Sequence, residues 1–196
     1  MFVINQCASG CGKPAISGSS LCASHLVNSG DEQKRIADFI KRQKSIRDVC
    51  AQGLHFSGLD LTGHQFNGCG FGGAIFTNCN FTKVKMRQVF FDFAAFTSCI
   101  FSDVDFGFLS FAGTVIKECV FKDSELTNIN YGGSFISDSF FTNNNLYNCR
   151  FIEADLLKTE IINCNLKRAN FFQCRQTDVI FKSSNTAEAI FSMDLV

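Results

Sequence analysis

The sequence predicts a solenoid, a fold in which short repeats stack along one axis, and two patterns between Leu54 and Phe191 support this prediction. The first is a large apolar residue at every fifth position from Phe56 onward, which fails only at Gln176 and Thr186, so that 26 of 28 such positions are apolar. A period of five fits neither the 3.6 residues of a helical turn nor the two-residue alternation of a strand. A fixed period sustained over most of a chain is typical of repeats that pack only on their neighbours.

The second pattern is a small residue two positions before each large one. Of the 28 positions in this register from Leu54 to Ala189, 22 are Cys, Ala, Ser, Thr or Val. Two inward positions in every five, one small and one large, fit a narrow tube whose interior is filled by side chains. The other three positions are mostly Asn, Asp, Lys, Ser, Thr and Gly, as the outer wall of such a tube requires.

The repeating units resemble the pentapeptide-repeat family, whose loose pattern is a small residue, a polar residue, Leu or Phe, and two variable residues. Matching units include Ala154-Asp155-Leu156, Ala169-Asn170-Phe171, Cys79-Asn80-Phe81, Cys164-Asn165-Leu166 and Val104-Asp105-Phe106. The resemblance covers residues 54–193 and implies an all-β solenoid, a right-handed quadrilateral parallel β-helix with 20 residues in each coil. The 140 residues of this range, divided by 20, give seven coils.

Residues 20 apart should then lie directly above one another inside the tube. One such column is Phe71, Phe91, Phe111, Tyr131, Phe151, Phe171 and Phe191, and a second is Phe81, Phe101, Phe121, Phe141, Ile161 and Phe181. A third column is Cys79, Cys99, Cys119 and Ser139. His64 and Asn144 also fall in the small inward register, where a polar side chain needs a hydrogen-bond partner, so we expect both to bond internally.

The N-terminal residues contain a cluster of metal-ligand residue types, with the spacing Cys7-x3-Cys11-x10-Cys22-x2-His25. Three thiolates and one imidazole are the ligand set of a closed tetrahedral Zn²⁺ site, and a closed site leaves no position for a substrate. The segment resembles the small cysteine–histidine zinc modules that precede various bacterial domains. We therefore expect a structural zinc ion, either as a staple alone or also as part of a contact surface. The alternatives are four unrelated reduced residues or a redox dithiol.

We expect three parts: a zinc-binding module over residues 1–30, a capping helix over residues 31–50 and the repeat array over residues 51–196. Ser29 and Glu32 have capping-box spacing at the start of the helix. Its expected apolar face comprises Ile36, Phe39, Ile40, Ile46, Val49 and Cys50. A solenoid must cover its open end, so this helix should lie over the first coil, and we expect the helix and the small zinc-binding segment to cap the array together. Its basic residues form a solvated face or a site for phosphate or an acidic partner.

The far end of the array is irregular, because Gln176, Ser184, Thr186 and Asp194 weaken both inward registers. The last ten residues are rich in apolar side chains, namely Ile190, Phe191, Met193, Leu195 and Val196. These residues either fold back over the last coil or meet a second molecule. The resemblance favours the second alternative, because family members often form homodimers through their C-terminal ends.

Composition predicts a reducing, cytoplasmic location. Seven of the 11 cysteines fall in the small inward register, where cysteine behaves as a compact apolar residue, rather than in a secreted disulfide framework. The N-terminus lacks the basic start and apolar run of a signal peptide, and no stretch approaches the ~20 apolar residues of a membrane span. The formal net charge is zero, but residues 1–53 have seven Lys and Arg against four Asp and Glu, and residues 54–196 have 11 against 14.

No catalytic motif is present, and we expect a non-enzymatic rod that binds an unknown protein partner and takes no small-molecule substrate. The alternative comes from the resemblance, since some pentapeptide-repeat rods mimic duplex DNA, bind DNA gyrase or topoisomerase IV and change quinolone sensitivity. That mimicry requires a strongly negative surface, whereas the net charge of residues 54–196 is only −3. Nucleic-acid binding through the N-terminal part, where the net charge is +3, is a weaker hypothesis.

Overall fold

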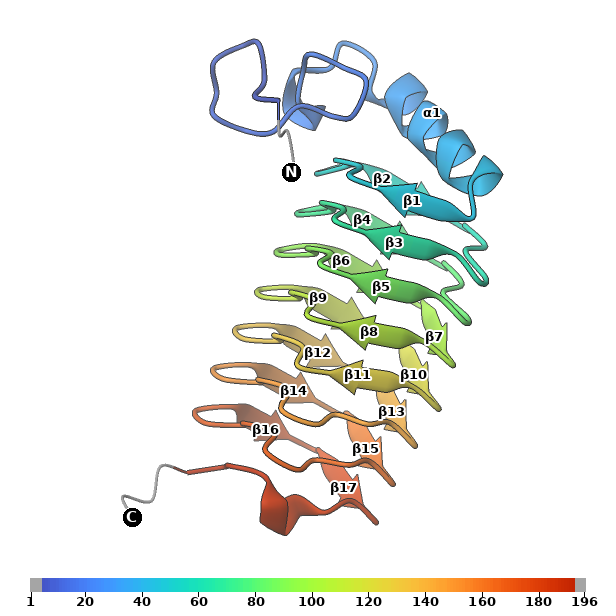
Figure 1. Ribbon diagram of the computed structural model, residues 1–196. Coiled ribbons are helices and arrows are strands. Elements are labelled where there is room, and N and C mark those ends of the chain that lie inside the picture. The colour runs from blue at the N-terminus through green and yellow to red at the C-terminus, as the bar shows by residue number, and fades with distance from the viewer. Residues whose placement is uncertain (1–4, 193–196) are drawn as a thin grey trace.

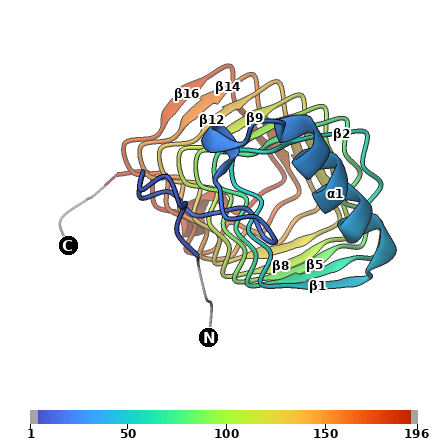
Figure 2. The same ribbon diagram turned by 90° about the horizontal axis from the view of Figure 1, so that it is seen from above.

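The computed structural model describes residues 5–192 and places a loop module and one helix on the end of a long rod (Figure 1). The rod is a parallel β-helix of about seven coils, the number of strands in its longest sheet. Seen along the axis, the coils overlie one another and enclose a four-sided outline (Figure 2). The predicted all-β solenoid is therefore confirmed.

Three sides of the rod are parallel sheets of three-residue strands. The β1 sheet contains β1 (Ser45–Arg47), β3 (Gln65–Asn67), β5 (Lys85–Arg87), β8 (Asp105–Gly107) and β11 (Glu125–Thr127). The β2 sheet contains β2 (His55–Ser57), β4 (Ile75–Thr77), β6 (Ala95–Thr97), β9 (Val115–Lys117), β12 (Phe135–Ser137), β14 (Asp155–Leu157) and β16 (Arg175–Thr177). The β7 sheet contains β7 (Ile100–Ser102), β10 (Val120–Lys122), β13 (Phe140–Thr142), β15 (Glu160–Ile162) and β17 (Ile180–Lys182).

The fourth side, which we call the bridge face, consists of turns joined by isolated bridges. It comprises residues 50–53, 70–73, 90–93, 110–113, 130–133, 150–153 and 170–173. Its bridges pair residues 20 apart, as in Cys50 with Gly70 and Gly70 with Phe90. The sheets have the same register, for example Phe56 with Phe76. Each coil therefore contains 20 residues, as predicted, and residues 20 apart stack at the ~4.8 Å spacing of hydrogen-bonded strands.

The core is a set of stacked rings along the axis. In the column that begins at Phe71, successive ring centroids are 4.7 to 5.4 Å apart as far as Phe191. In the second column, the rings of Phe101, Phe121 and Phe141 lie 4.4 and 4.5 Å apart and within 1° of parallel. Both predicted columns are confirmed. Stacking and edge contacts between rings add to the free energy gained by burying them.

The two polar side chains of the small register are buried and hydrogen-bonded, as predicted. The Asn144 amide donates to the Phe121 carbonyl at 2.8 Å and accepts from the Ser124 N–H at 3.0 Å. The ring nitrogens of His64 face the carbonyl oxygens of Leu61 at 2.8 Å and Ile40 at 3.2 Å. His64 therefore links the capping helix to the coil beneath it.

The helix is shorter than predicted and starts earlier. The helix α1 (Ser29–Arg42) follows Asn28, so Ser29 is its first residue rather than its cap, and no capping box forms. The expected end at Cys50 is wrong because Ile46 and Val49 also satisfy the five-residue register. Ile46 pairs with Phe66 inside the first coil, so the array begins before the expected residue 51. Only Ile36 and Ile40 of α1 are buried, and they lie over that coil.

The C-terminal end is irregular, as expected. The residues of β16, including Gln176, are exposed, Phe181 is half-buried, and a 3-10 helix, η2 (Thr186–Glu188), follows. Phe191 is 39% exposed at the end of the aromatic column. The predictions made for Met193, Asp194, Leu195 and Val196 lie outside the described residues. Within residues 5–192, no helix is both long and apolar enough to cross a membrane.

Candidate metal centre

A short hairpin places Cys7 and Cys11 side by side. Gln6 forms an antiparallel bridge with Pro14, and the Cys7 N–H donates to the Lys13 carbonyl at 2.9 Å. The turn between the two strands uses Gly10 at φ 72° and Gly12 at φ 74°, a backbone conformation that glycine adopts without steric cost. Cys7 precedes this turn and Cys11 lies within it, between the two glycines, so their thiols reach the same point.

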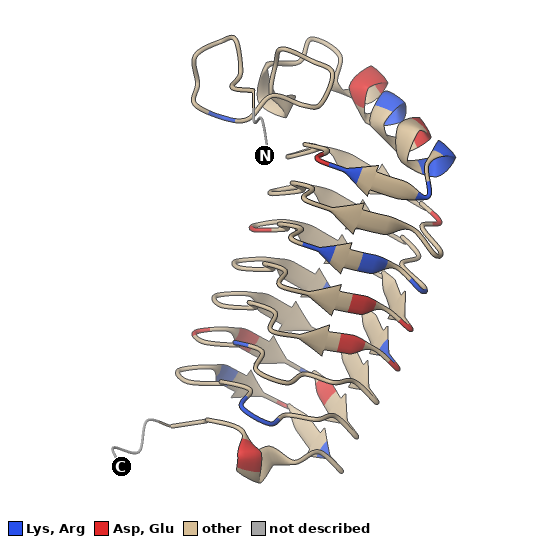
Figure 3. Cartoon of the chain, in the orientation of Figure 1, with Lys and Arg blue, Asp and Glu red and all other residues tan. Residues whose placement is uncertain are grey.

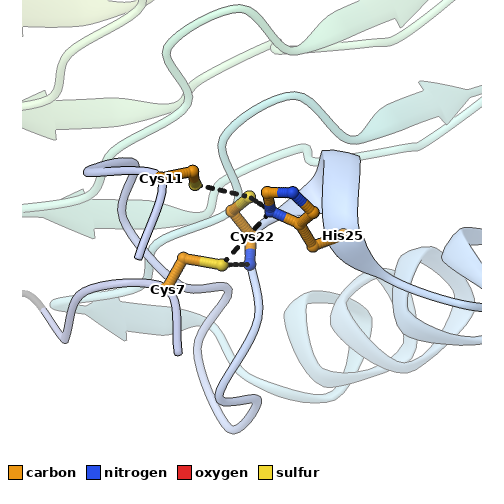
Figure 4. A group of neighbouring side chains, drawn as sticks. All are labelled: Cys7, Cys11, Cys22 and His25. Atoms are coloured by element: carbon orange, nitrogen blue, oxygen red, sulfur yellow. Dashed lines mark hydrogen bonds between the residues drawn. The ribbon is translucent and has the colours of Figure 1, made fainter. Parts of the chain in front are cut away.

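Cys22 and His25 reach that point from a second segment. A 3-10 helix, η1 (Ala23–His25), follows Cys22 directly, and the His25 N–H donates to the Cys22 carbonyl at 2.9 Å. This single turn brings both side chains to one side. The four side chains converge beneath the loops of the N-terminal module (Figure 4). The four predicted site residues are thus brought together, and their ligand atoms lie within 4.8 Å of one another.

The distances fit a tetrahedral zinc site. With bonds of about 2.3 Å to sulfur and about 2.1 Å to nitrogen, such an ion would separate two sulfurs by roughly 3.8 Å and a sulfur from a nitrogen by roughly 3.6 Å. Cys11 Sγ lies 3.7 Å from Cys22 Sγ. His25 Nδ1 lies 3.5 Å from Cys7 Sγ and 3.4 Å from Cys22 Sγ. The donor set and its spacing could therefore hold a metal ion.

The environment favours the thiolate, the form in which cysteine binds metal, at two of the three cysteines of the cluster. The backbone N–H of Cys22 donates to Cys7 Sγ at 3.3 Å and lowers the pKa of the Cys7 thiol to about 6. A hydrogen bond with the Ser24 hydroxyl lowers the pKa of Cys22 in the same direction, whereas desolvation and the neighbouring Cys22 and Cys7 thiols raise the pKa of Cys11. Cys7 and Cys22 therefore differ from the fully buried Cys149 of the rod, where burial raises the pKa to about 12.

The module is attached to the first coil by hydrogen bonds and by apolar contact. Ser17 donates its N–H to the Cys50 carbonyl at 2.9 Å, and its hydroxyl accepts from the Cys50 N–H at 2.8 Å. Ile16 is buried in the same core as Ile36 and Ile40. Figure 2 shows the module and α1 side by side over the first coil. The cap is therefore made by both elements, as predicted.

Sequence reasoning missed a groove of about 540 Å³ between this module and the bridge face. Its lining includes Lys13 and Pro14 from the module and Phe90 and Phe93 from the rod. The signal was present in the sequence, because Phe90 and Phe93 fall on outward positions that most other coils fill with small or polar residues.

Residues 65–103 and 136–175 match the family model for pentapeptide repeats, with 8 copies of the repeat. A search of curated proteins found no match. Among solved structures, the chain is similar to a trypsin-treated variant of QnrB1, a plasmid-mediated fluoroquinolone resistance protein, with a TM-score of 0.62 and 19% identity over 71% of this chain and 75% of that one. At this identity the likeness concerns the fold alone.

Two cyanobacterial pentapeptide-repeat proteins align over more of the chain but superpose less well. HetL from Nostoc sp. strain PCC 7120, involved in heterocyst differentiation regulation, has a TM-score of 0.34 and 11% identity over 80% of this chain and 95% of that one. Rfr23 from Cyanothece 51142 has a TM-score of 0.35 and 7% identity over 81% and 98%.

Proposed function

The chain belongs to the pentapeptide-repeat family, and on this premise we propose that it is a non-enzymatic rod that binds a protein partner through one side. The family's rods are generally scaffolds. The proposal depends on an exposed apolar column along the β7 sheet, formed by Ile100, Val120 and Phe140 at equivalent positions of β7, β10 and β13. Glu160 of β15 interrupts the column, and Ile180 of β17 continues it. Ile100, Phe140 and Ile180 are 47%, 44% and 50% exposed. Aligned apolar side chains on a rigid surface are typical of a protein interface.

The binding side is tested by a charge placed in the middle of the column. Phe140→Lys should lower recovery of the partner from a lysate of the source organism by at least about tenfold, because a lysine would be desolvated in the interface. Thr142→Lys is the matched control, since Thr142 is also outward on β13 and half-buried. Equal recovery with both variants, at unchanged circular dichroism, would exclude this side as the interface.

We further propose that Cys7, Cys11, Cys22 and His25 bind one structural Zn²⁺ and that residues 1–30 act as a module. The fit of the sulfur and nitrogen distances supports this role, as do the lowered pKa values of Cys7 and Cys22. When bound, the ion would cross-link two segments that have few apolar side chains of their own. With α1, the module would cover the first coil, and the remaining residues would form the binding rod.

The topoisomerase alternative has less support. QnrB1 is a fluoroquinolone resistance protein, but in this chain the sign of the charge changes along the β1 sheet, from basic residues on β1 and β5 to acidic residues on β8 and β11 (Figure 3). Asp103 and Asp123 are followed in the same column by Asn143 and Asn163. The neighbouring column passes from Asp105 and Glu125 to Asn145 and Asn165. Carboxylates therefore occupy only two successive coils, a short length compared with the regular phosphate charge of duplex DNA.

A gyrase assay separates the two functions. We expect no change in supercoiling as the protein is added, with or without a quinolone, because the acidic surface is too short to replace a DNA segment. Inhibition of supercoiling, or protection of gyrase from the drug, would favour topoisomerase binding over the proposed function.

Two smaller parts of the proposal concern assembly and location. A homodimer through the C-terminal end is supported by the partial exposure of Ile190 and Phe191, and a sedimentation mass of one chain would exclude it. A reducing compartment such as the cytoplasm is supported by the free, buried thiols of the rod, and export of the intact protein in cell fractionation would contradict it.

A further inference from the structure

The groove between the module and the bridge face has a floor of two glycines and two unlike walls. Gly72 and Gly73 form the floor, with the Gln52 side chain lying against Gly72. Pro14 and Ala23 are part of the module wall, and Phe90 and Phe93 form the wall on the rod. The groove is therefore an opening to which both the cap and the rod contribute.

Backbone N–H groups on this floor lack the partner that equivalent groups have elsewhere in the rod. In seven other turns, a side-chain oxygen caps the N–H two residues later. The capping residues are Asp60, Asn80, Ser110, Asn130, Asn145, Asn165 and Asn170. At the groove these places are taken by Cys50, Gly70 and Phe90, whose side chains provide no oxygen.

Three donors in consecutive coils consequently lack an oxygen partner. Within residues 5–192, no protein oxygen accepts from the N–H of Gln52, Gly72 or Asp92, and all three residues line the groove. The Gln52 N–H faces the Cys50 thiol, a weak acceptor. Stacked coils place these N–H groups ~4.8 Å apart, so the outer two are separated by roughly 9.6 Å. Backbone donors of this kind bind an acceptor wherever water is displaced.

The aromatic wall is unusual in its exposure. Phe93 is 78% exposed and lies in the left-handed turn conformation that recurs along the rod, with φ 60°. The same position is glycine in four other coils, at Gly53, Gly73, Gly113 and Gly133. The Phe93 ring lies over Gly113, where an added Cβ would come within 2.7 Å of it. An exposed aromatic residue with space kept for its ring supports a binding role.

The chemistry of the groove selects its occupant. Besides Cys22, a candidate metal ligand, its charged lining residues are Lys13 and Asp92, which are of opposite sign, and the Asp92 carboxylate accepts from the Ser110 hydroxyl. The site therefore suits a neutral ligand that has apolar groups for the rings and oxygen acceptors for the open N–H groups. Proline-rich segments have this character, because proline has an apolar ring and a free carbonyl but no N–H to be left unpaired.

The spacing agrees with this chemistry. One turn of a polyproline II helix contains three residues and rises about 9.3 Å, so carbonyls three residues apart point in the same direction. The distance between two such carbonyls is close to the distance between the N–H groups of Gln52 and Asp92. We propose that this groove binds a proline-rich segment of a partner protein in the polyproline II conformation. The proposal rests on the protein-binding function inferred above and adds a second site with a partner of defined chemistry.

The test is calorimetric titration of the full-length, zinc-loaded protein with a blocked nonaproline peptide. We expect saturable binding in the micromolar to millimolar range, and none with a blocked glycine–serine peptide of equal length. Gly70→Asn would introduce the side-chain cap of the other turns, and an added Cβ meets only the Gln52 amide at 3.5 Å, an ordinary contact. Phe93→Gly would introduce the residue of the other coils. Each variant should bind about tenfold more weakly.

Two controls define the outcome. Arg150→Asn introduces the same cap in another turn of the bridge face, outside the groove, and should bind the peptide normally. Phe140→Lys alters the proposed interface on the β7 sheet and should also bind the peptide normally. Loss of peptide binding at the groove can therefore be distinguished from loss of partner binding at the β7 sheet. The proposal is overturned if the unaltered protein does not bind nonaproline, or if Gly70→Asn and Phe93→Gly bind as tightly as it does. Binding that requires removal of residues 1–4 would also overturn it, since the chain itself would then be the occupant.

Discussion

Phe121→Ala is expected to lower the free energy of unfolding by about 3–5 kcal/mol, the range for truncating a buried phenylalanine. Phe121 is fully buried, with its ring 4.4 Å from that of Phe101 and 4.5 Å from that of Phe141. Removing the ring leaves a cavity inside the tube. The neighbouring rings cannot close it, because the hydrogen bonds of β7, β10 and β13 fix the spacing of the coils.

Urea denaturation followed by circular dichroism measures this effect. The control is Phe140→Ala, which removes the same ring from a position that is 44% exposed and should cost less than about 1 kcal/mol. Similar losses for the two variants would mean that the buried, stacked ring of Phe121 stabilises the rod no more than the exposed ring of Phe140 does.

Cys22→Ser is expected to abolish metal binding and release the N-terminal module from the rod. Cys22 Sγ lies within 3.7 Å of both Cys11 Sγ and His25 Nδ1, so its loss opens the tetrahedron. Structural zinc contributes about 10–16 kcal/mol of apparent binding free energy in small modules. The few buried apolar residues of the module, such as Ala15 and Ile16, cannot replace a contribution of that size.

The measurement combines zinc content after dialysis with limited trypsin digestion. We expect about one zinc per unaltered chain and almost none for the variant, which should become cleavable at Lys13 while the β spectrum of the rod persists. Cys174→Ser, a half-buried cysteine at the other end, should retain the metal. Unchanged zinc content in Cys22→Ser would show that the ligand assignment is wrong.

Much of the rod could be predicted from the sequence because the positions that face inward recur at short, fixed intervals along the chain. Every inward residue repeats after five positions, so the stacking of Cys79, Cys99 and Cys119 follows from counting. Ser139 takes the next place in that column, where its hydroxyl accepts the Cys119 N–H at 3.1 Å. The four candidate metal ligands could also be identified, because their residue types and short spacings suffice to bring them together.

The boundary between cap and rod could not be predicted, because Ile46 and Val49 fit a helical face and the five-residue register equally well. Pairing of β1 with β3 decides between them, and that contact joins residues 20 apart. The groove was missed for a related reason. Its open N–H groups depend on which residue two positions earlier lacks a capping oxygen, and on three such places stacking at Cys50, Gly70 and Phe90.

The columns of like residues have a consequence for how such a chain can change in length. Inserting or deleting one five-residue unit would keep every small and large residue facing inward. If it lay between Phe101 and Phe121, however, it would turn all later residues by one side of the rod, and Phe121 would no longer stack on Phe101. If it lay between Asn143 and Asn163, it would break the hydrogen bond between them. Only a change of 20 residues preserves both. We infer that whole coils, rather than single repeats, are the units by which this sequence can grow or shrink during evolution.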